Sequence, residues 1–164
     1  MSPYRPDFVD CWIFRGDALE REILLIRRSA SEEILPGLWQ CVTGSLEGGE
    51  RVALGALREV AEETGFGPDE ILAFYDLDLV NAFHEPGYDA IVAAAVFALR
   101  VLPGRDPFLS DEHDAFRWLP LAGIEPELAW PGYHDAVRRI REFLADPARA
   151  AWFELTLAGG RVRQ

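Results

Sequence analysis

Residues 44–66 read GSLEGGERVALGALREVAEETGF, a glycine-rich loop followed directly by a segment with helical periodicity. The helical segment covers residues 51–64, and Gly65 with Gly67-Pro68 supplies the stop signals. Glycines allow the loop backbone to approach a ligand closely and to adopt positive φ. The stretch therefore predicts a loop that leads straight into the start of a helix.

The acidic residues of this helix follow a pattern that ordinary surface helices avoid. On a helical wheel we assign one set of apolar side chains to the core: Ala53, Leu54, Leu57, Val60 and Ala61. Glu59, Glu62 and Glu63 fall on the opposite side at spacings of three and four residues, so we expect their carboxylates to converge, with Arg58 at one edge. Clustered hard oxygen ligands suit Mg²⁺ or Mn²⁺. A solvated acidic face is the competing interpretation, and for Glu50 it is simple capping of the helix.

Outside this unit the chain alternates strand-like runs with turn signals. We expect strands at residues 8–14 and 22–27, which form a hairpin, and at residues 39–43, 71–83, 90–102 and 116–119. A second helix is expected at residues 133–144, and the tail from Asp146 onward is ambiguous, with residues 152–157 as a candidate strand. We therefore predict one α+β domain over residues 1–164, in which two main helices cover a mixed β-sheet.

The charge balance excludes several classes of function. The 164 residues include 16 basic and 28 acidic side chains, for a net charge of −12, and all the basic residues are arginine. A chain without lysine cannot use a Schiff base, a lysine nucleophile or a Walker A phosphate loop. The negative charge also argues against binding to nucleic acid polymers and to anionic membrane surfaces.

The two cysteines and the apolar runs indicate where the protein works. Cys11 and Cys41 lie in apolar runs without metal-ligand spacing, so we expect buried free thiols in a reducing compartment. The first residues lack the apolar core of a signal peptide. The longest apolar run, residues 90–99, is too short to span a bilayer. A cytoplasmic protein that does not bind membranes is expected.

The loop and helix of residues 44–66 resemble the Nudix box, the signature of the Nudix hydrolase (MutT-like) family. The positions that match the box, Gly-x5-Glu-x7-Arg-Glu-U-x-Glu-Glu-x-Gly-U with U apolar, are Gly44, Glu50, Arg58, Glu59, Val60, Glu62, Glu63, Gly65 and Phe66. The order of the expected elements over residues 8–145 is also similar to the Nudix α/β/α sandwich. This resemblance implies hydrolysis of a nucleoside diphosphate linked to another group, with Mg²⁺ or Mn²⁺ as the cofactor.

The resemblance also implies roles for the residues of the box. Glu59, Glu62 and Glu63 would hold the metal, and the carbonyl of Gly44 would add a ligand. Arg58 would orient the carboxylates, while Glu50 would support the loop or bind a further metal. Glu62 or Glu63 would be the catalytic base.

Some Nudix enzymes instead take the base from a loop before a late strand. Glu112 stands in that place here, with a plain solvated loop as the alternative. The adjacent His113 is interpreted as an ordinary loop histidine.

The substrate is less constrained than the reaction. Residues 38–45 together with Glu112-His113 resemble the branch that contains dihydroneopterin triphosphate pyrophosphatase, whose relatives act on deoxynucleoside triphosphates or dinucleoside polyphosphates. A pocket for the pterin or nucleobase ring of such a substrate needs an aromatic surface and a few polar groups. The candidates are Trp39, Asn81, Phe83 and Tyr88, with Arg27 and Arg28 for phosphate oxygens; ordinary packing or solvation is the competing role for each.

Two other functions are compatible with the same scaffold. One is a nucleotide-binding or regulatory module that does not hydrolyse its ligand, although such modules are expected to lose carboxylates of the box. The other is an isoprenyl diphosphate isomerase, which would need a cysteine such as Cys41 as a proton donor. The expected partner is a small nucleotide or pterin triphosphate, and the protein is expected to be a monomer or a homodimer.

Overall fold

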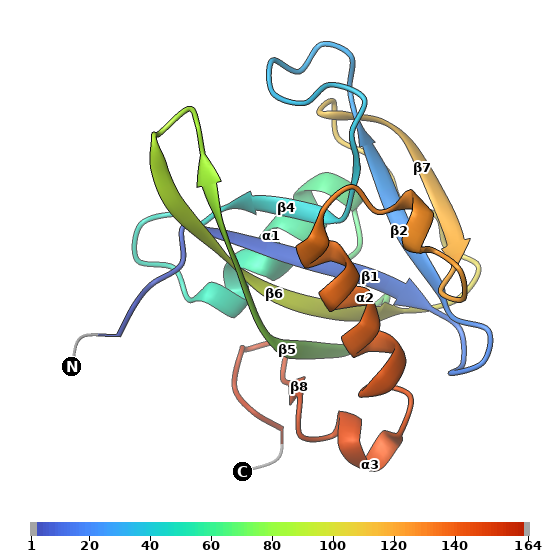
Figure 1. The fold of residues 1–164 in the computed structure, drawn as a ribbon. Helices are drawn as coiled ribbons and strands as arrows, with labels where there is room; N and C mark the ends of the chain where they lie inside the picture. The colour runs from blue at the N-terminus through green and yellow to red at the C-terminus, as the bar shows by residue number, and fades with distance from the viewer. Residues whose placement is uncertain (1–2, 163–164) are drawn as a thin grey trace.

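Eight strands form one mixed sheet in the computed structural model, which describes residues 3–162 (Figure 1). The strands are β1 (Phe8–Arg15), β2 (Glu22–Arg28), β3 (Trp39–Gln40), β4 (Val42–Ser45), β5 (Ile71–Glu85), β6 (Ala90–Val101), β7 (His113–Pro120) and β8 (Glu154–Leu155). Their order is β3-β2-β1-β6-β5-β8, with β4 paired to β1 and β7 paired to β2. The helices are α1 (Val52–Thr64), α2 (Pro131–Glu142) and the short α3 (Pro147–Ala150), and a 3-10 turn, η1, covers Glu125–Glu127.

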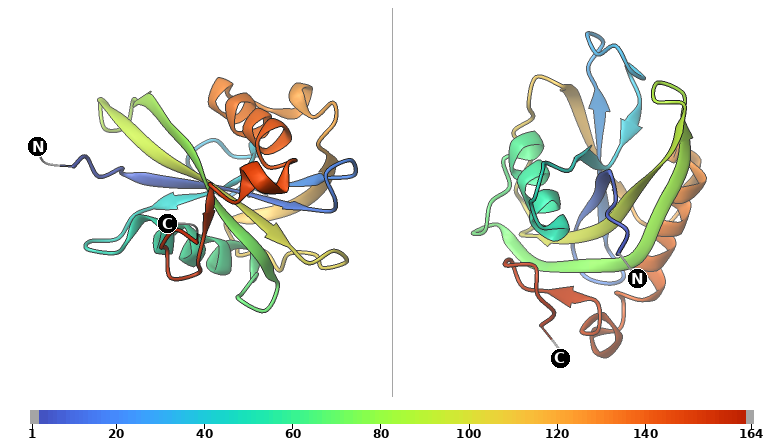
Figure 2. Two further views of the ribbon diagram at one scale, coloured as in Figure 1. Left: turned by 90° about the horizontal axis from the view of Figure 1, so that it is seen from below. Right: turned by 90° about the vertical axis from the view of Figure 1, so that its left-hand side faces the viewer.

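The sheet is covered on both faces, with α1 on one side and α2 on the other (Figure 2). Strand β1 pairs with β6 in parallel and with β2 and β4 antiparallel, so it lies in the middle of the sheet. Successive side chains of a strand point to opposite faces. Trp12 therefore belongs to the core beneath α2 and Ile13 to the core beneath α1, and both are fully buried. An almost continuously apolar strand is the consequence of this double coverage.

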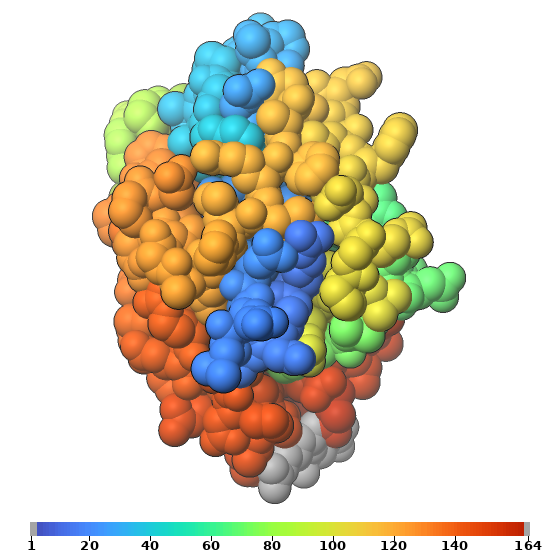
Figure 3. All heavy atoms as spheres, turned by 90° about the vertical axis from the view of Figure 1, so that its right-hand side faces the viewer, coloured from blue at the N-terminus to red at the C-terminus, as the bar shows by residue number. Residues whose placement is uncertain are grey.

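The predicted α+β sandwich with two main helices is confirmed, and the differences lie at the ends of elements. The expected hairpin of β1 and β2 is present, and the extended segment at residues 39–43 divides into β3 and β4. Strand β7 begins at His113, three residues earlier than the sequence pattern indicates, because residues 113–120 continue the ladder along β2. Figure 3 shows residues 113–130, in amber and orange, on the surface beside the β1–β2 turn.

The core-facing side of α1 differs from the expectation. The buried residues are Gly55, Ala56, Glu59, Val60, Glu63 and Thr64, whereas Leu54 and Ala61 are exposed. The absence of a side chain at Gly55 explains why this face of the helix is buried. A Cβ at Gly55 would overlap the Leu46 side chain, so glycine lets the helix pack closely against the preceding loop. Two of the three glutamates consequently lie inside the fold rather than opposite its core.

Two smaller expectations can also be compared with the structure. Cys11 and Cys41 are buried and free, as predicted. No helix within residues 3–162 is long and apolar enough to cross a membrane.

Candidate active site

The loop before α1 is shaped around the side chain of Glu59. Strand β4 pairs with β1, and Gly44 stands opposite Val9 in that ladder. A Cβ placed on Gly44 would overlap the carboxyl group of Glu59. Glycine at this position therefore lets the backbone of the loop lie directly against a buried carboxylate.

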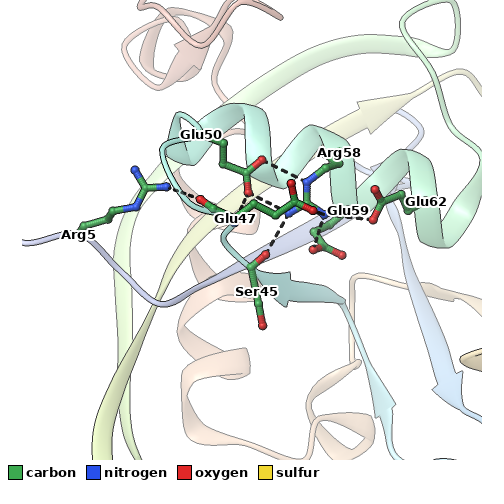
Figure 4. Close-up of polar contacts among 7 residues, drawn as sticks. All are labelled: Arg5, Ser45, Glu47, Glu50, Arg58, Glu59 and Glu62. Carbon is green, nitrogen blue, oxygen red and sulfur yellow. Dashed lines mark hydrogen bonds and ion pairs between the residues drawn. The ribbon is translucent and has the colours of Figure 1, made fainter.

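Arg58 is the centre of a hydrogen-bond network that joins the loop to the helix (Figure 4). Its guanidinium donates two bonds to Glu50, at 3.1 and 2.9 Å, and one to the carbonyl oxygen of Ser45, at 3.0 Å. A further nitrogen, Nη1, donates to Glu59 at 2.8 Å and to Glu62 at 3.1 Å. Because a planar guanidinium holds several acceptors in fixed directions, one residue orients both the loop and two carboxylates of the helix.

Glu50 supports the loop and does not cap the helix. Its carboxylate accepts the backbone N–H of Glu47 at 2.6 Å in addition to the bonds from Arg58. These bonds, that of Arg58 first, lower the pKa of Glu50 to about 2. Arg51 occupies the N-cap position of α1 without a capping side chain.

Glu63 is the least compensated carboxylate of the site. It is 6% exposed, and its Oε2 atom has no hydrogen-bond partner among the residues that the structure describes. Burial raises the pKa of Glu63 to about 9, and the charges of Glu59 and Glu112 add to the rise. Burial also raises the pKa of Glu59, although the bond from Arg58 opposes the shift. An unpaired buried carboxylate is costly, so a cation at this point would stabilise the fold as well as serve chemistry.

The oxygen donors at this point fit a hard divalent cation, which the family resemblance implies. Glu59 and Glu63 face the interior, and the Gly44 backbone lies against the first of them. Glu62 instead turns outward to Arg58, with a side chain that is 57% exposed. The predicted convergence of all three carboxylates is therefore absent: within residues 3–162, no group of three His, Cys, Asp or Glu side chains is arranged to hold a metal ion. The inward pair is the part of the prediction that the geometry supports.

The loop that carries Glu112 is attached to the end of α1. The backbone N–H of Phe108 donates to the carbonyl of Thr64 at 2.9 Å, and that of Ser110 donates to the carbonyl of Glu63 at 3.2 Å. Glu112 is exposed, and its charge contributes to the raised pKa values of Glu59 and Glu63. The structure thus brings Glu112 near the buried carboxylates, and its role as a base stays a prediction.

His113 belongs to the site, and the expectation of an ordinary loop histidine is wrong. Its side chain is completely buried, and its Nε2 atom lies 3.9 Å from Oε2 of Glu63 and 3.3 Å from Nε2 of Gln40. Burial, reinforced by Arg28, lowers the pKa of His113 to about 4, so the imidazole is neutral near pH 7. Gln40 is also buried, and its position in an otherwise apolar strand was the sequence signal that could have revealed this contact.

The aromatic and basic candidates for substrate binding are partly engaged with one another. Trp39 has Arg117 over its ring at 4.0 Å and Arg27 at 5.6 Å. Arg27 also forms an ion pair with Asp114 at 2.6 Å and remains 41% exposed. Arg28 holds the loop between β2 and β3, since it donates to the carbonyl of Ile34 at 2.7 Å and to Glu32 at 2.9 Å. Arg27 is thus the more accessible of the two arginines.

The remaining candidates lie on the β5–β6 hairpin, which projects from the sheet (Figure 1). Asn81 donates to the buried Asp10 at 3.1 Å, and its side chain fills the space that the Cβ of a larger residue at Gly132 would need. Phe83 and Tyr88 are exposed, the latter in the turn of the hairpin. The contact with Asp10 gives Asn81 a structural role, while the two aromatic side chains are free to meet a ligand.

Cys41 does not support isomerase chemistry. The thiol is buried in the core beneath α2, and burial raises its pKa well above the ordinary value. A neutral thiol enclosed in this way is a poor proton donor or acceptor for a substrate.

Comparison with known proteins identifies the family. The family model of the NUDIX domain matches residues 5–143, so the chain belongs to the NUDIX domain family. A curated protein of Myxococcus xanthus named octanoyltransferase is 36% identical over 129 residues, which cover 77% of this chain and 34% of that protein. Nudix hydrolase 8 of Arabidopsis thaliana is 29% identical over 62% of this chain and 27% of its own length. The chain thus spans between about a quarter and a third of the length of these relatives.

Solved structures show the same fold. The Caenorhabditis elegans Ap4A hydrolase has a TM-score of 0.71 at 20% identity, and the match covers 86% of this chain and 98% of that one. The Escherichia coli dihydroneopterin triphosphate pyrophosphohydrolase has a TM-score of 0.66 at 23% identity, covering 87% and 97%.

Proposed function

We propose that the protein is a divalent-metal-dependent pyrophosphohydrolase that cleaves the phosphoanhydride of a nucleoside triphosphate-like substrate. The observation that carries this proposal is the buried carboxylate oxygen of Glu63, which has no hydrogen-bond partner within the described residues and lies one helical turn from Glu59, itself against the backbone of Gly44. The complete Nudix box in a chain of the NUDIX family supports it further.

Each residue of the site has a task in this proposal. Glu59, Glu63 and the carbonyl of Gly44 would hold Mg²⁺ or Mn²⁺, and Glu62 would join them on release from Arg58. When bound, the cation would neutralise the negative charge of the diphosphate. Arg58 keeps the loop and the carboxylates in register. Glu112, on a separate loop, is the candidate to accept the proton of the attacking water, with Glu62 and Glu63 as alternatives.

The proposed substrate is a small nucleotide or pterin triphosphate. Trp39 with its flanking arginines, and the exposed Phe83 and Tyr88, offer aromatic surface to a ring. Arg27 is exposed enough to contact phosphate oxygens. Dihydroneopterin triphosphate, deoxynucleoside triphosphates and dinucleoside polyphosphates all carry both a planar ring and a chain of phosphates. The fold shared with the E. coli and C. elegans enzymes is compatible with each of them.

A panel of these substrates, extended with ADP-ribose, tests the proposal with phosphate and pyrophosphate release as the measurement. We expect release that requires Mg²⁺ or Mn²⁺. Glu63→Gln should lower kcat by about two to three orders of magnitude, because charge stabilisation at the reacting phosphate is lost. Glu20→Gln, the same substitution in the exposed β1–β2 turn, is the matched control.

Two outcomes would contradict the proposal. Near-normal turnover of Glu63→Gln would remove Glu63 from the chemistry. Tight binding of a panel member without any release would instead favour the nucleotide-binding module.

A further inference from the structure

The imidazole of His113 fills the space between a carboxylate of the box and a strand of the sheet. Its side chain has no exposed surface, and Nε2 faces Oε2 of Glu63 at 3.9 Å and the amide of Gln40 at 3.3 Å. Gln40 is itself only 3% exposed. Three buried polar side chains from three separate elements, α1, β3 and β7, therefore meet at one point.

The backbone holds this meeting point rigidly. His113 begins β7 opposite Arg28, and its N–H donates to the carbonyl of Ser110 at 3.1 Å. The N–H of Ser110 in turn donates to the carbonyl of Glu63. Gln40 is fixed by its pairing with Ile26 in β2. The imidazole is thus anchored to the same turn of helix that presents Glu63.

Glu63 needs an orienting group that the rest of the box does not supply. Arg58 donates to Glu50, Glu59 and Glu62, whereas Oε2 of Glu63 has no hydrogen-bond partner within the described residues. The nitrogen that faces it is Nε2 of His113, which is a donor when the neutral imidazole carries its proton there. A movement of less than about 1 Å would bring the two atoms to ordinary hydrogen-bond distance.

We propose that His113 is a positioning residue for Glu63: packed against Gln40, the imidazole with its proton on Nε2 donates to the carboxylate and turns it toward the divalent cation. The structure places Nε2 of Gln40 against this ring nitrogen, so the proposed tautomer requires the Gln40 amide in the opposite orientation, with its oxygen accepting from the same N–H. Hydrogen bonds to metal-binding carboxylates are worth about 10–100-fold in metal affinity or activity. This inference rests on the proposed function, since it assumes that Glu63 binds the metal.

The competing interpretation is that His113 only fills space in the core. Substitutions separate the two roles because they change shape and hydrogen bonding independently. His113→Phe keeps an aromatic ring and removes the donor. His113→Gln places an amide near the position of Nε2, whereas His113→Asn places one near Nδ1 instead.

The experiment measures Mn²⁺ affinity of the full chain without substrate, by electron paramagnetic resonance of the free ion, together with kcat. We expect His113→Phe to weaken Mn²⁺ binding about 10–100-fold and His113→Gln to retain affinity within about threefold of the wild type. Gln40→Leu should give a smaller loss, because it frees the imidazole without removing it. His134→Phe, at an exposed histidine of α2, is the matched control.

Thermal unfolding in EDTA shows whether each variant folds. Wild-type Mn²⁺ affinity in a folded His113→Phe would overturn the inference. If that variant does not fold, equal affinities of His113→Gln and His113→Asn would overturn it, and a clear preference for Gln would support it. A wild-type protein that neither binds Mn²⁺ nor hydrolyses the panel would refute the proposed function itself, which is a distinguishable result.

Discussion

Substituting Gly44 by alanine tests how closely the loop must lie against the carboxylates. The added Cβ would overlap Cδ and both oxygens of Glu59, which Arg58 holds at 2.8 Å. The carboxylate has to move by about 1 Å or more, and a misplacement of that size costs about a hundredfold in rate, or about 2.7 kcal/mol of transition-state stabilisation. Overpacking of a closely packed site is expected to lower the free energy of unfolding by about 1–3 kcal/mol.

The assays are kcat/KM with Mg²⁺ on the best substrate of the panel and urea unfolding monitored by circular dichroism. Gly48→Ala is the control, because a Cβ there meets no atom within 4 Å. The double variant Gly44→Ala/Glu59→Ala should recover stability without recovering activity, since it relieves the overlap and removes the ligand. Wild-type activity and stability of Gly44→Ala would refute the reasoning that the loop is shaped around Glu59.

Two further predictions concern charge. The pKa of Glu63 is raised to about 9, so the folded metal-free protein binds this proton more tightly than the unfolded chain does; its free energy of unfolding should fall as pH rises from about 4.5 to about 9. Urea titrations across that range should show a flatter profile for Glu63→Gln and for the wild type in Mg²⁺, and identical slopes in all three would contradict the assignment. Glu112→Gln should lower kcat at least tenfold with little change in the free energy of unfolding, because the side chain is exposed; a smaller loss would make Glu112 a bystander.

Much of the fold could be predicted because strands buried on both faces are almost continuously apolar. Residues 8–14 and 90–99 were recognisable for this reason, and β1 and β6 form the parallel centre of the sheet. Ends of elements were less predictable. The start of β7 depends on its pairing with β2, and the sequence of residues 113–116 alone does not predict that pairing.

The site was predictable in its residue types and less so in its geometry. Spacing on a helix gives the angles between Glu59, Glu62 and Glu63 but not which sector faces the sheet. That sector is decided by Gly55, whose contact with the preceding loop is tertiary. The same limit applies to His113, since its burial arises from contacts with β3 and α1 that are distant in sequence.

The bonds that join residues 108–110 to the last turn of α1 have a consequence for the length of that loop. The final carbonyls of a helix lack partners within the helix. Here the carbonyls of Glu63 and Thr64 accept hydrogen bonds from the N–H groups of Ser110 and Phe108. These bonds fix the loop to the helix end, so the number of residues between Ser110 and Glu112 sets the position of Glu112. Inserting one residue between Ser110 and Glu112 is expected to move Glu112 away from Glu63. An insertion at the turn of Gly104, where an added Cβ meets no atom within 4 Å, is expected to be tolerated. Surface loops usually tolerate changes in length, and this segment is expected not to tolerate them.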